Sequence, residues 1–120
     1  MLVKYKDVKA FKTKDGSLIR ELIHPAHHGC KNQSFAEAVV PAGTKTALHL
    51  HRQSEEIYHV TQGEALMTLG MKTFMISQGD TILIPALTAH CLENNSEEDL
   101  HVICACAPGY RHEDTELLDD

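Results

Sequence analysis

The sequence lacks tryptophan, has few other aromatic residues and contains no long hydrophobic run. Only 5% of its 120 residues are aromatic. No segment approaches the roughly 18 consecutive apolar residues that a membrane-spanning helix requires. Residues 1–12 alternate charged and apolar side chains and do not form the hydrophobic stretch of a signal peptide. We therefore expect a cytoplasmic protein with no membrane partner.

Positive charge is also in short supply. Eleven Lys and Arg residues stand against seventeen Asp and Glu residues, which gives a net charge of −6. A net acidic surface disfavours binding to nucleic acids and to anionic membranes. Part of the acidic excess lies in the C-terminal tail, at Glu113, Asp114, Glu116, Asp119 and Asp120.

The four cysteines form no Cys-x-x-Cys pair, which excludes a zinc ribbon and a thioredoxin-like redox motif. Cys104 and Cys106 lie in an apolar run over residues 100–106. Free cysteine packs as a small hydrophobic side chain. We therefore expect these two thiols to be buried and reduced in a strand.

Helical periodicity is almost absent, and short β-rich runs separated by turn residues take its place. About eight such runs follow one another without a connection long enough for a crossover helix, so the strands are expected to pair antiparallel. This pattern predicts an all-β fold, a double-sheet antiparallel jelly roll. The expected strands cover residues 35–40, 46–51, 56–61, 65–69, 73–76, 81–84, 89–93 and 100–107.

A chain of 120 residues fits a single domain over residues 1–120. We expect a barrel over about residues 35–107, with an N-terminal arm before it and an acidic tail after it. The polar sequence after Pro108 is expected to be a solvated end. The alternative is a segment that folds back over the barrel.

Nine histidines are the main anomaly of the composition. Alternate side chains of a strand share a face, so His49 and His51 point the same way, about 6 to 7 Å apart along the strand. Glu56 opens the next strand and can face back toward them, and a barrel would bring His90 alongside. Three imidazoles and one carboxylate suit one divalent transition metal (Mn, Fe, Co, Ni, Cu or Zn) and exclude a calcium-type cage of oxygen ligands.

Two motifs carry a family resemblance. The first reads Gly43-x5-His49-x-His51-x4-Glu56-x6-Gly63, and the second reads Gly79-x5-Pro85-x-Leu87-x2-His90-x3-Asn94. They resemble the two motifs of the cupin superfamily, β-barrel proteins in which the matching three histidines and the glutamate bind a metal. The resemblance selects Glu56 over Glu55 as the carboxylate ligand, because only Glu56 has the family's spacing to Gly63.

Leu87 departs from the family pattern, which has glycine at this position. A side chain makes positive φ unfavourable. We therefore expect the loop before His90 to have a different shape.

Other residues leave alternatives open. Tyr58 is expected on the cavity face of its strand, where its hydroxyl contacts a substrate or its ring only packs the barrel. His59 faces the other way, at the surface or at a subunit contact. His24, His27 and His28 lie in a loop-like stretch that contains a proline. We expect surface histidines there, with a second metal site as the alternative.

Three imidazoles and one carboxylate leave open positions on an ion that prefers five or six ligands, and a substrate oxygen can bind there. The resemblance implies a metal-dependent enzyme acting on a small oxygen-bearing molecule, of dioxygenase, decarboxylase or isomerase type. The alternative is a non-catalytic module that binds a sugar-like small molecule. Small cupins pair their sheets across a two-fold axis, so a homodimer is expected. Apolar residues of the N-terminal arm could add a strand to the partner: Leu2, Val3, Tyr5 and Val8.

Overall fold

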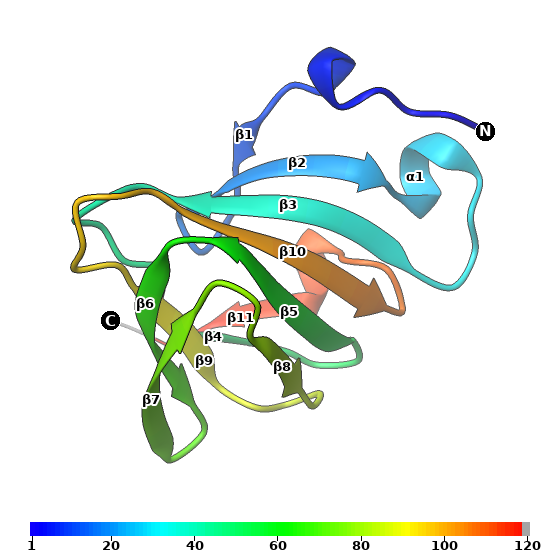
Figure 1. The fold of residues 1–120 in the computed structure, drawn as a ribbon. Coiled ribbons are helices and arrows are strands. Elements are labelled where there is room, and N and C mark those ends of the chain that lie inside the picture. The colour runs from blue at the N-terminus through cyan, green and yellow to red at the C-terminus, as the bar shows by residue number, and fades with distance from the viewer. Residues whose placement is uncertain (119–120) are drawn as a thin grey trace.

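Two antiparallel sheets that enclose one core make up nearly all of the structure (Figure 1). It is a computed structural model and describes residues 1–118. One sheet has six strands in the order β1-β2-β3-β10-β5-β8, and the other has five in the order β11-β4-β9-β6-β7. The predicted all-β jelly roll is confirmed. The strands are β1 (Phe11–Lys12), β2 (Leu18–Ile23), β3 (Ser34–Val40), β4 (His49–His51), β5 (Glu55–Gln62), β6 (Glu64–Leu69), β7 (Lys72–Ser77), β8 (Thr81–Ile84), β9 (His90–Glu93), β10 (Leu100–Ala107) and β11 (Thr115–Leu117), and the short helices are η1 (Tyr5–Asp7), α1 (Pro25–His28) and η2 (His112–Asp114).

The eight strands expected from the sequence correspond to β3 through β10. The largest shift is in β4, which begins at His49 and not at Thr46. Thr46 nevertheless holds this segment against β9. Its N–H donates to the carbonyl oxygen of Leu92, and its hydroxyl oxygen accepts from the N–H of the same residue, each at 2.9 Å.

The alternation of buried and exposed residues builds the core from one face of each central strand. Every second residue of β10 is buried, and β5 alternates in the same way up to Val60. Tyr58 is therefore on the inner face and His59 on the outer face, as predicted. Cys104 and Cys106 are buried and free, which also agrees with the sequence. The largest fully buried apolar side chains are Met67, Ile84, Leu100, Val40, Val60 and Val102.

Gly63 makes the turn that passes the chain from β5 in one sheet to β6 in the other. Its φ is 89°, in the region that residues with a side chain rarely occupy. A Cβ here would lie 2.8 Å from the carbonyl oxygen of Asp99. Both the turn and the close approach of a neighbouring loop therefore require glycine.

The N-terminal segment extends the barrel wall of its own chain. β2 pairs with β3, and β1 pairs with β2. The first eight residues form no strand; the Tyr5 hydroxyl donates to Glu37 Oε1 at 2.5 Å, and Arg20 stacks over the Tyr5 ring. The loop-like stretch that follows β2 contains one helical turn, α1. Within residues 1–118, no helix has the length and apolar character needed to cross a bilayer.

The prediction of a solvated C-terminal tail is wrong for the part that the structure describes. β11 pairs with the edge of β4. Asp114 is buried, and its carboxylate accepts hydrogen bonds from the backbone N–H groups of Gln53 (2.9 Å) and Ser54 (3.1 Å). The short acidic sequence of the tail has no periodic pattern from which the pairing of β11 with β4 could be predicted. Asp119 and Asp120, which the sequence also assigned to the acidic tail, lie outside the described residues.

The loop before His90 makes a turn with positive φ at Leu87, although this chain has leucine where the family pattern has glycine. Leu87 has a φ of 66°, and no other non-glycine residue of the described chain has positive φ. The expectation of a different conformation at this position is therefore wrong. The N–H of Leu87 donates to the carbonyl oxygen of His51 at 2.8 Å, and this bond holds the leucine in the left-handed region.

Candidate metal centre

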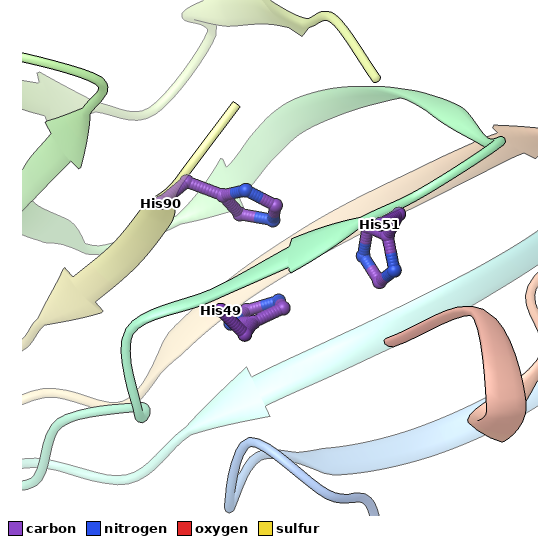
Figure 2. Close-up of side chains that lie close together, drawn as sticks. All are labelled: His49, His51 and His90. Atoms are coloured by element: carbon purple, nitrogen blue, oxygen red, sulfur yellow. The ribbon is translucent and has the colours of Figure 1, made fainter. Parts of the chain in front are cut away.

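Three histidine rings converge inside the barrel. His49 and His51 are alternate residues of β4, and His90 is the residue of β9 that pairs with His49. Their ligand atoms all lie within 4.8 Å of one another, and the three side chains are buried. Figure 2 shows the rings directed into the same space from two neighbouring strands. The strand parity read from the sequence brings the first two together, and only the pairing of β4 with β9 adds the third.

Hydrogen bonds at Nδ1 orient two of the rings. His49 Nδ1 lies 2.8 Å from the carbonyl oxygen of Ala47, and His90 Nδ1 lies 2.9 Å from that of Thr88. A carbonyl oxygen can only accept, so each Nδ1 atom carries the proton. In the neutral rings, the Nε2 atom of each histidine then has a lone pair free to bind a metal.

The third ring is oriented by the C-terminal segment. His51 Nδ1 lies 3.1 Å from the hydroxyl oxygen of Thr115, the first residue of β11. The Thr115 hydroxyl donates its own proton to the carbonyl oxygen of Arg111 at 3.1 Å. It therefore accepts from His51 Nδ1, and the lone pair of His51 also lies on Nε2.

Glu56 directs its carboxylate at the same cluster. Its Oε1 atom lies 3.2 Å from His51 Nε2 and 3.5 Å from His90 Nε2. Its other oxygen, Oε2, accepts a hydrogen bond from Cys106 Sγ at 3.3 Å. Glu56 is buried, whereas Glu55 is exposed at the surface. The structure thus brings the three predicted histidines within 4.8 Å of one another and places the predicted Glu56 against two of them.

The electrostatics of the cluster fit a bound cation. Burial raises the pKa of the Glu56 carboxyl, but His51 and His90, when they are protonated and donate to it, outweigh burial and lower this pKa to about 2. Burial, together with His90, lowers the pKa of His49. Among the described residues, Glu56 Oε1 and His90 Nε2 are buried polar atoms without a hydrogen-bond partner. Such atoms are costly unless something binds them, and this mixed nitrogen and oxygen donor set suits a divalent transition metal.

A cavity inside the barrel opens onto the cluster. Tyr58 lines it, and the Tyr58 ring meets the His90 ring edge-on with 5.9 Å between centroids. Burial, and then the charge of Glu56, raise the pKa of Tyr58 well above its ordinary value. The hydroxyl therefore remains protonated and able to donate a hydrogen bond into the cavity.

Several further residues that line the cavity were not singled out as site residues from the sequence, among them Asp15, Cys104, Cys106 and Tyr110. Cys104 and Cys106 follow the inward parity of β10, but parity does not tell a cavity wall from a packed core. Burial raises the pKa of both thiols, so they stay protonated. Asp15 comes from the turn between β1 and β2, and Tyr110 from the segment before η2. Asp15-Gly16 is a turn signal, but nothing in it indicates that the turn reaches the barrel.

A surface groove outside the cavity carries more positive than negative charge, although the whole chain has a net charge of −6. It shares lining residues with the cavity, including Thr13, Glu21 and Tyr110. Four cationic side chains face two glutamates in this groove: Lys12, Lys14, Lys31 and Arg111 against Glu21 and Glu113.

The histidines of the α1 region form no such cluster. His24 Nδ1 accepts from the N–H of Ala26 at 3.0 Å, and its Nε2 atom lies 2.6 Å from the carbonyl oxygen of Tyr110. His28 Nδ1 accepts from the N–H of His24 at 3.0 Å. His27 is exposed. In the described chain these rings serve local structure, and they are not among the groups close enough to share one ion.

Comparison with known proteins identifies relatives over most of the chain. The family profile described as "Cupin domain" matches residues 36–106. An uncharacterized protein of Methanocaldococcus jannaschii is 50% identical over 115 residues, which cover 96% of this chain and 92% of that protein.

Solved structures share the fold at low sequence identity. The polyketide cyclase RemF from Streptomyces resistomycificus matches with a TM-score of 0.81 and 20% identity, over 100% of this chain and 86% of that one. A predicted oxalate decarboxylase from Thermotoga maritima matches with a TM-score of 0.78 and 23% identity, over 90% of this chain and 99% of that one. These likenesses agree with the jelly-roll barrel that the strand pairing shows.

Proposed function

The chain belongs to the cupin family, and we propose that it is a metal-dependent enzyme acting on a small oxygen-bearing molecule. In this proposal His49, His51, Glu56 and His90 hold one divalent transition metal ion: Mn, Fe, Ni, Co, Cu or Zn. The ion supplies a Lewis acid that polarises an oxygen atom of the substrate. The reaction is of dioxygenase, decarboxylase or isomerase type.

One observation carries this proposal. Three imidazoles each have their Nδ1 proton bound by an oxygen acceptor, so three Nε2 lone pairs and the Glu56 carboxylate face one another. Lone pairs and a carboxylate at 3.2 to 3.5 Å repel unless a cation lies among them.

The surroundings of the cluster support a catalytic role. Tyr58 offers a protonated hydroxyl within the same cavity, suited to bind a substrate oxygen. The surface groove that shares Thr13, Glu21 and Tyr110 with the cavity carries four cationic side chains, which favours a substrate with an anionic group at its outer end. Two of the fold neighbours are described as a polyketide cyclase and a predicted oxalate decarboxylase, and both names are those of enzymes that act on small molecules.

Metal content tests the ligand assignment. The wild-type chain, purified without added metal and then loaded, is expected to hold one ion per chain. His51→Ala should lose most of it, because a ligand and its orienting bond to Thr115 disappear together. Glu55→Ala is the matched control and should keep the ion, since Glu55 is exposed on the outer face. A full complement of metal in His51→Ala would overturn the assignment.

The alternative is a non-catalytic module that binds a sugar-like molecule. The two functions differ in whether a bound compound is consumed. Diketones, flavonols, oxalate and sugar phosphates, incubated with the loaded protein while oxygen uptake and product are followed, should reveal turnover that Tyr58→Phe slows. Calorimetric binding of a neutral sugar with no turnover of any compound would favour the binding module.

We also propose that the chain forms a homodimer through the outer face of the six-stranded sheet. Strand register places four apolar residues in one row across β3, β10, β5 and β8: Phe35, Ala105, Ile57 and Leu83. The side chains of Phe35, Ile57 and Leu83 are exposed by 45%, 43% and 56%. A second copy related by a two-fold axis would cover the same row on both chains.

Light scattering after gel filtration tests the dimer. The wild type is expected to elute as a dimer at micromolar concentration, and the double variant Ile57→Lys, Leu83→Lys as a monomer. Met75→Lys is the control, because Met75 is also exposed, by 61%, but lies on the five-stranded sheet. A monomeric wild type would rule the proposal out.

A further inference from the structure

A second carboxylate approaches one ring of the histidine cluster, His49, from the N-terminal segment, outside residues 36–106 that match the family. Asp15 lies in the turn between β1 and β2, and its Oδ2 atom is 3.6 Å from His49 Nε2. Its side chain is only 14% exposed and lines the same cavity as Glu56. The separation is close to the 3.2 and 3.5 Å that relate Glu56 to the other two rings.

The turn holds the Asp15 carboxylate so that Oδ1 accepts hydrogen bonds within the turn and Oδ2 points toward His49. Oδ1 accepts from the Thr13 hydroxyl (2.8 Å), from the Ser17 N–H (3.0 Å) and from the Ser17 hydroxyl (2.7 Å). The carbonyl oxygen of Asp15 accepts from the N–H of Ala47 at 2.7 Å, just before β4. Lys14 ties the same turn to β11 through the carbonyl oxygen of Thr115 at 2.8 Å. These hydrogen bonds therefore fix the position of the Asp15 carboxylate relative to β4 and β11.

Asp15 and Glu56 are built alike. In each, one oxygen accepts from the protein, through Ser17 and Thr13 or through Cys106. The other oxygen faces histidine nitrogen: one Nε2 atom at Asp15 and two at Glu56. The proton of His49 is on Nδ1, bound to Ala47, so Nε2 has no hydrogen to give to Asp15. With the ring neutral, a carboxylate oxygen and a nitrogen lone pair at 3.6 Å repel each other, and a cation bound by both atoms removes this repulsion, as at Glu56.

We propose that Asp15 is the second carboxylate ligand of the ion. This inference rests on the proposed metal centre and deepens it. Two carboxylates cancel the charge of a divalent ion, and added oxygen ligands favour Mn²⁺ or Fe²⁺ over softer choices. Five protein ligands on a six-coordinate ion leave one position. The substrate then binds the ion through one atom, and a chelating substrate would have to displace Asp15.

Titration calorimetry of the metal-free protein with Mn²⁺ and Co²⁺ tests the inference. Asp15→Asn and Asp15→Ser keep a polar group in the turn and should weaken affinity at least about tenfold. Glu21→Gln is the matched control: Glu21 lines the same cavity, but its carboxylate contacts His24 and His27, and affinity should be unchanged. Melting curves of the metal-free variants check that each is folded.

Water-proton relaxation of the Mn²⁺-loaded proteins gives a second readout that does not depend on affinity. Removing a ligand opens a position for water, so Asp15→Asn should raise the relaxivity about twofold, from one bound water to two. Unchanged affinity and relaxivity in both folded Asp15 variants would overturn the inference and leave the four-ligand centre intact. Failure of the wild type to bind Mn²⁺, Co²⁺ or any of the other four proposed ions (Fe, Ni, Cu and Zn) would instead overturn the proposed function.

Discussion

Leu87 shows how a single residue stores strain next to the candidate centre. Its φ of 66° lies in the left-handed region, which is unfavourable for a residue with a side chain by about 1–2 kcal/mol. The side chain is 63% exposed and contributes little burial in return. The N–H of Leu87 bonds the carbonyl oxygen of His51, so the strained turn is attached to the strand of the candidate ligands.

Replacing this leucine by glycine should stabilise the protein. Glycine adopts positive φ without a steric penalty, and the relief should exceed its larger loss of chain entropy, for a net gain of about 0.5–1 kcal/mol in the free energy of unfolding. Urea denaturation measures the change. Ala86→Gly, one residue earlier and without positive φ, is the control and should destabilise slightly. Equal changes in the free energy of unfolding for Leu87→Gly and Ala86→Gly would show that Leu87 is not strained.

At the scale of elements, the C-terminal segment η2–β11 supports the centre from outside the family motifs. Asp114 bonds two backbone N–H groups in the turn between β4 and β5, while Thr115 orients His51. The segment thereby joins the ends of the two strands that carry three of the four candidate ligands.

Loss of the Asp114 carboxylate should destabilise the fold. Asp114→Ala leaves the N–H groups of Gln53 and Ser54 without their acceptor, and we expect a loss of about 2 kcal/mol in the free energy of unfolding. Glu113→Ala, at an exposed neighbour, should change it by less than about 0.5 kcal/mol. Chemical denaturation of the metal-free proteins measures both. Similar small losses would mean that the segment does not hold the turn.

At the scale of the whole molecule, acid should weaken the metal-loaded protein more than the metal-free one. The folded-state pKa of His49 is lowered below its ordinary 6.5, so the unfolded chain binds more protons and stability declines as pH falls below about 6.5 even without metal. The lowered pKa of Glu56, about 2, contributes stability above its ordinary 4.5 that is lost only between 4.5 and 2. Protons on free histidines also compete with the ion, and each tenfold loss of affinity removes about 1.4 kcal/mol of its stabilisation.

Melting curves at pH 8 and pH 5, with and without metal, measure this dependence. The increase in melting temperature that metal produces is expected to be large at pH 8 and much smaller at pH 5. Glu55→Ala should behave as the wild type does at both values. An equal increase at both pH values would argue against three histidine ligands.

The sequence by itself determined the barrel through local periodicity, and it indicated the four candidate ligands through the spacing of two motifs that resemble those of the cupin family. Only the pairing of β4 with β9 brings His90 beside the other two histidines. Strand parity puts His49 and His51 on one face and separates buried Glu56 from exposed Glu55. Asp15, Tyr110 and the pairing of β11 with β4 were decided only by tertiary structure. These segments are held by hydrogen bonds to backbone groups at strand edges and in turns. Every sequence has such backbone groups, so the pattern of side chains does not predict where these bonds form.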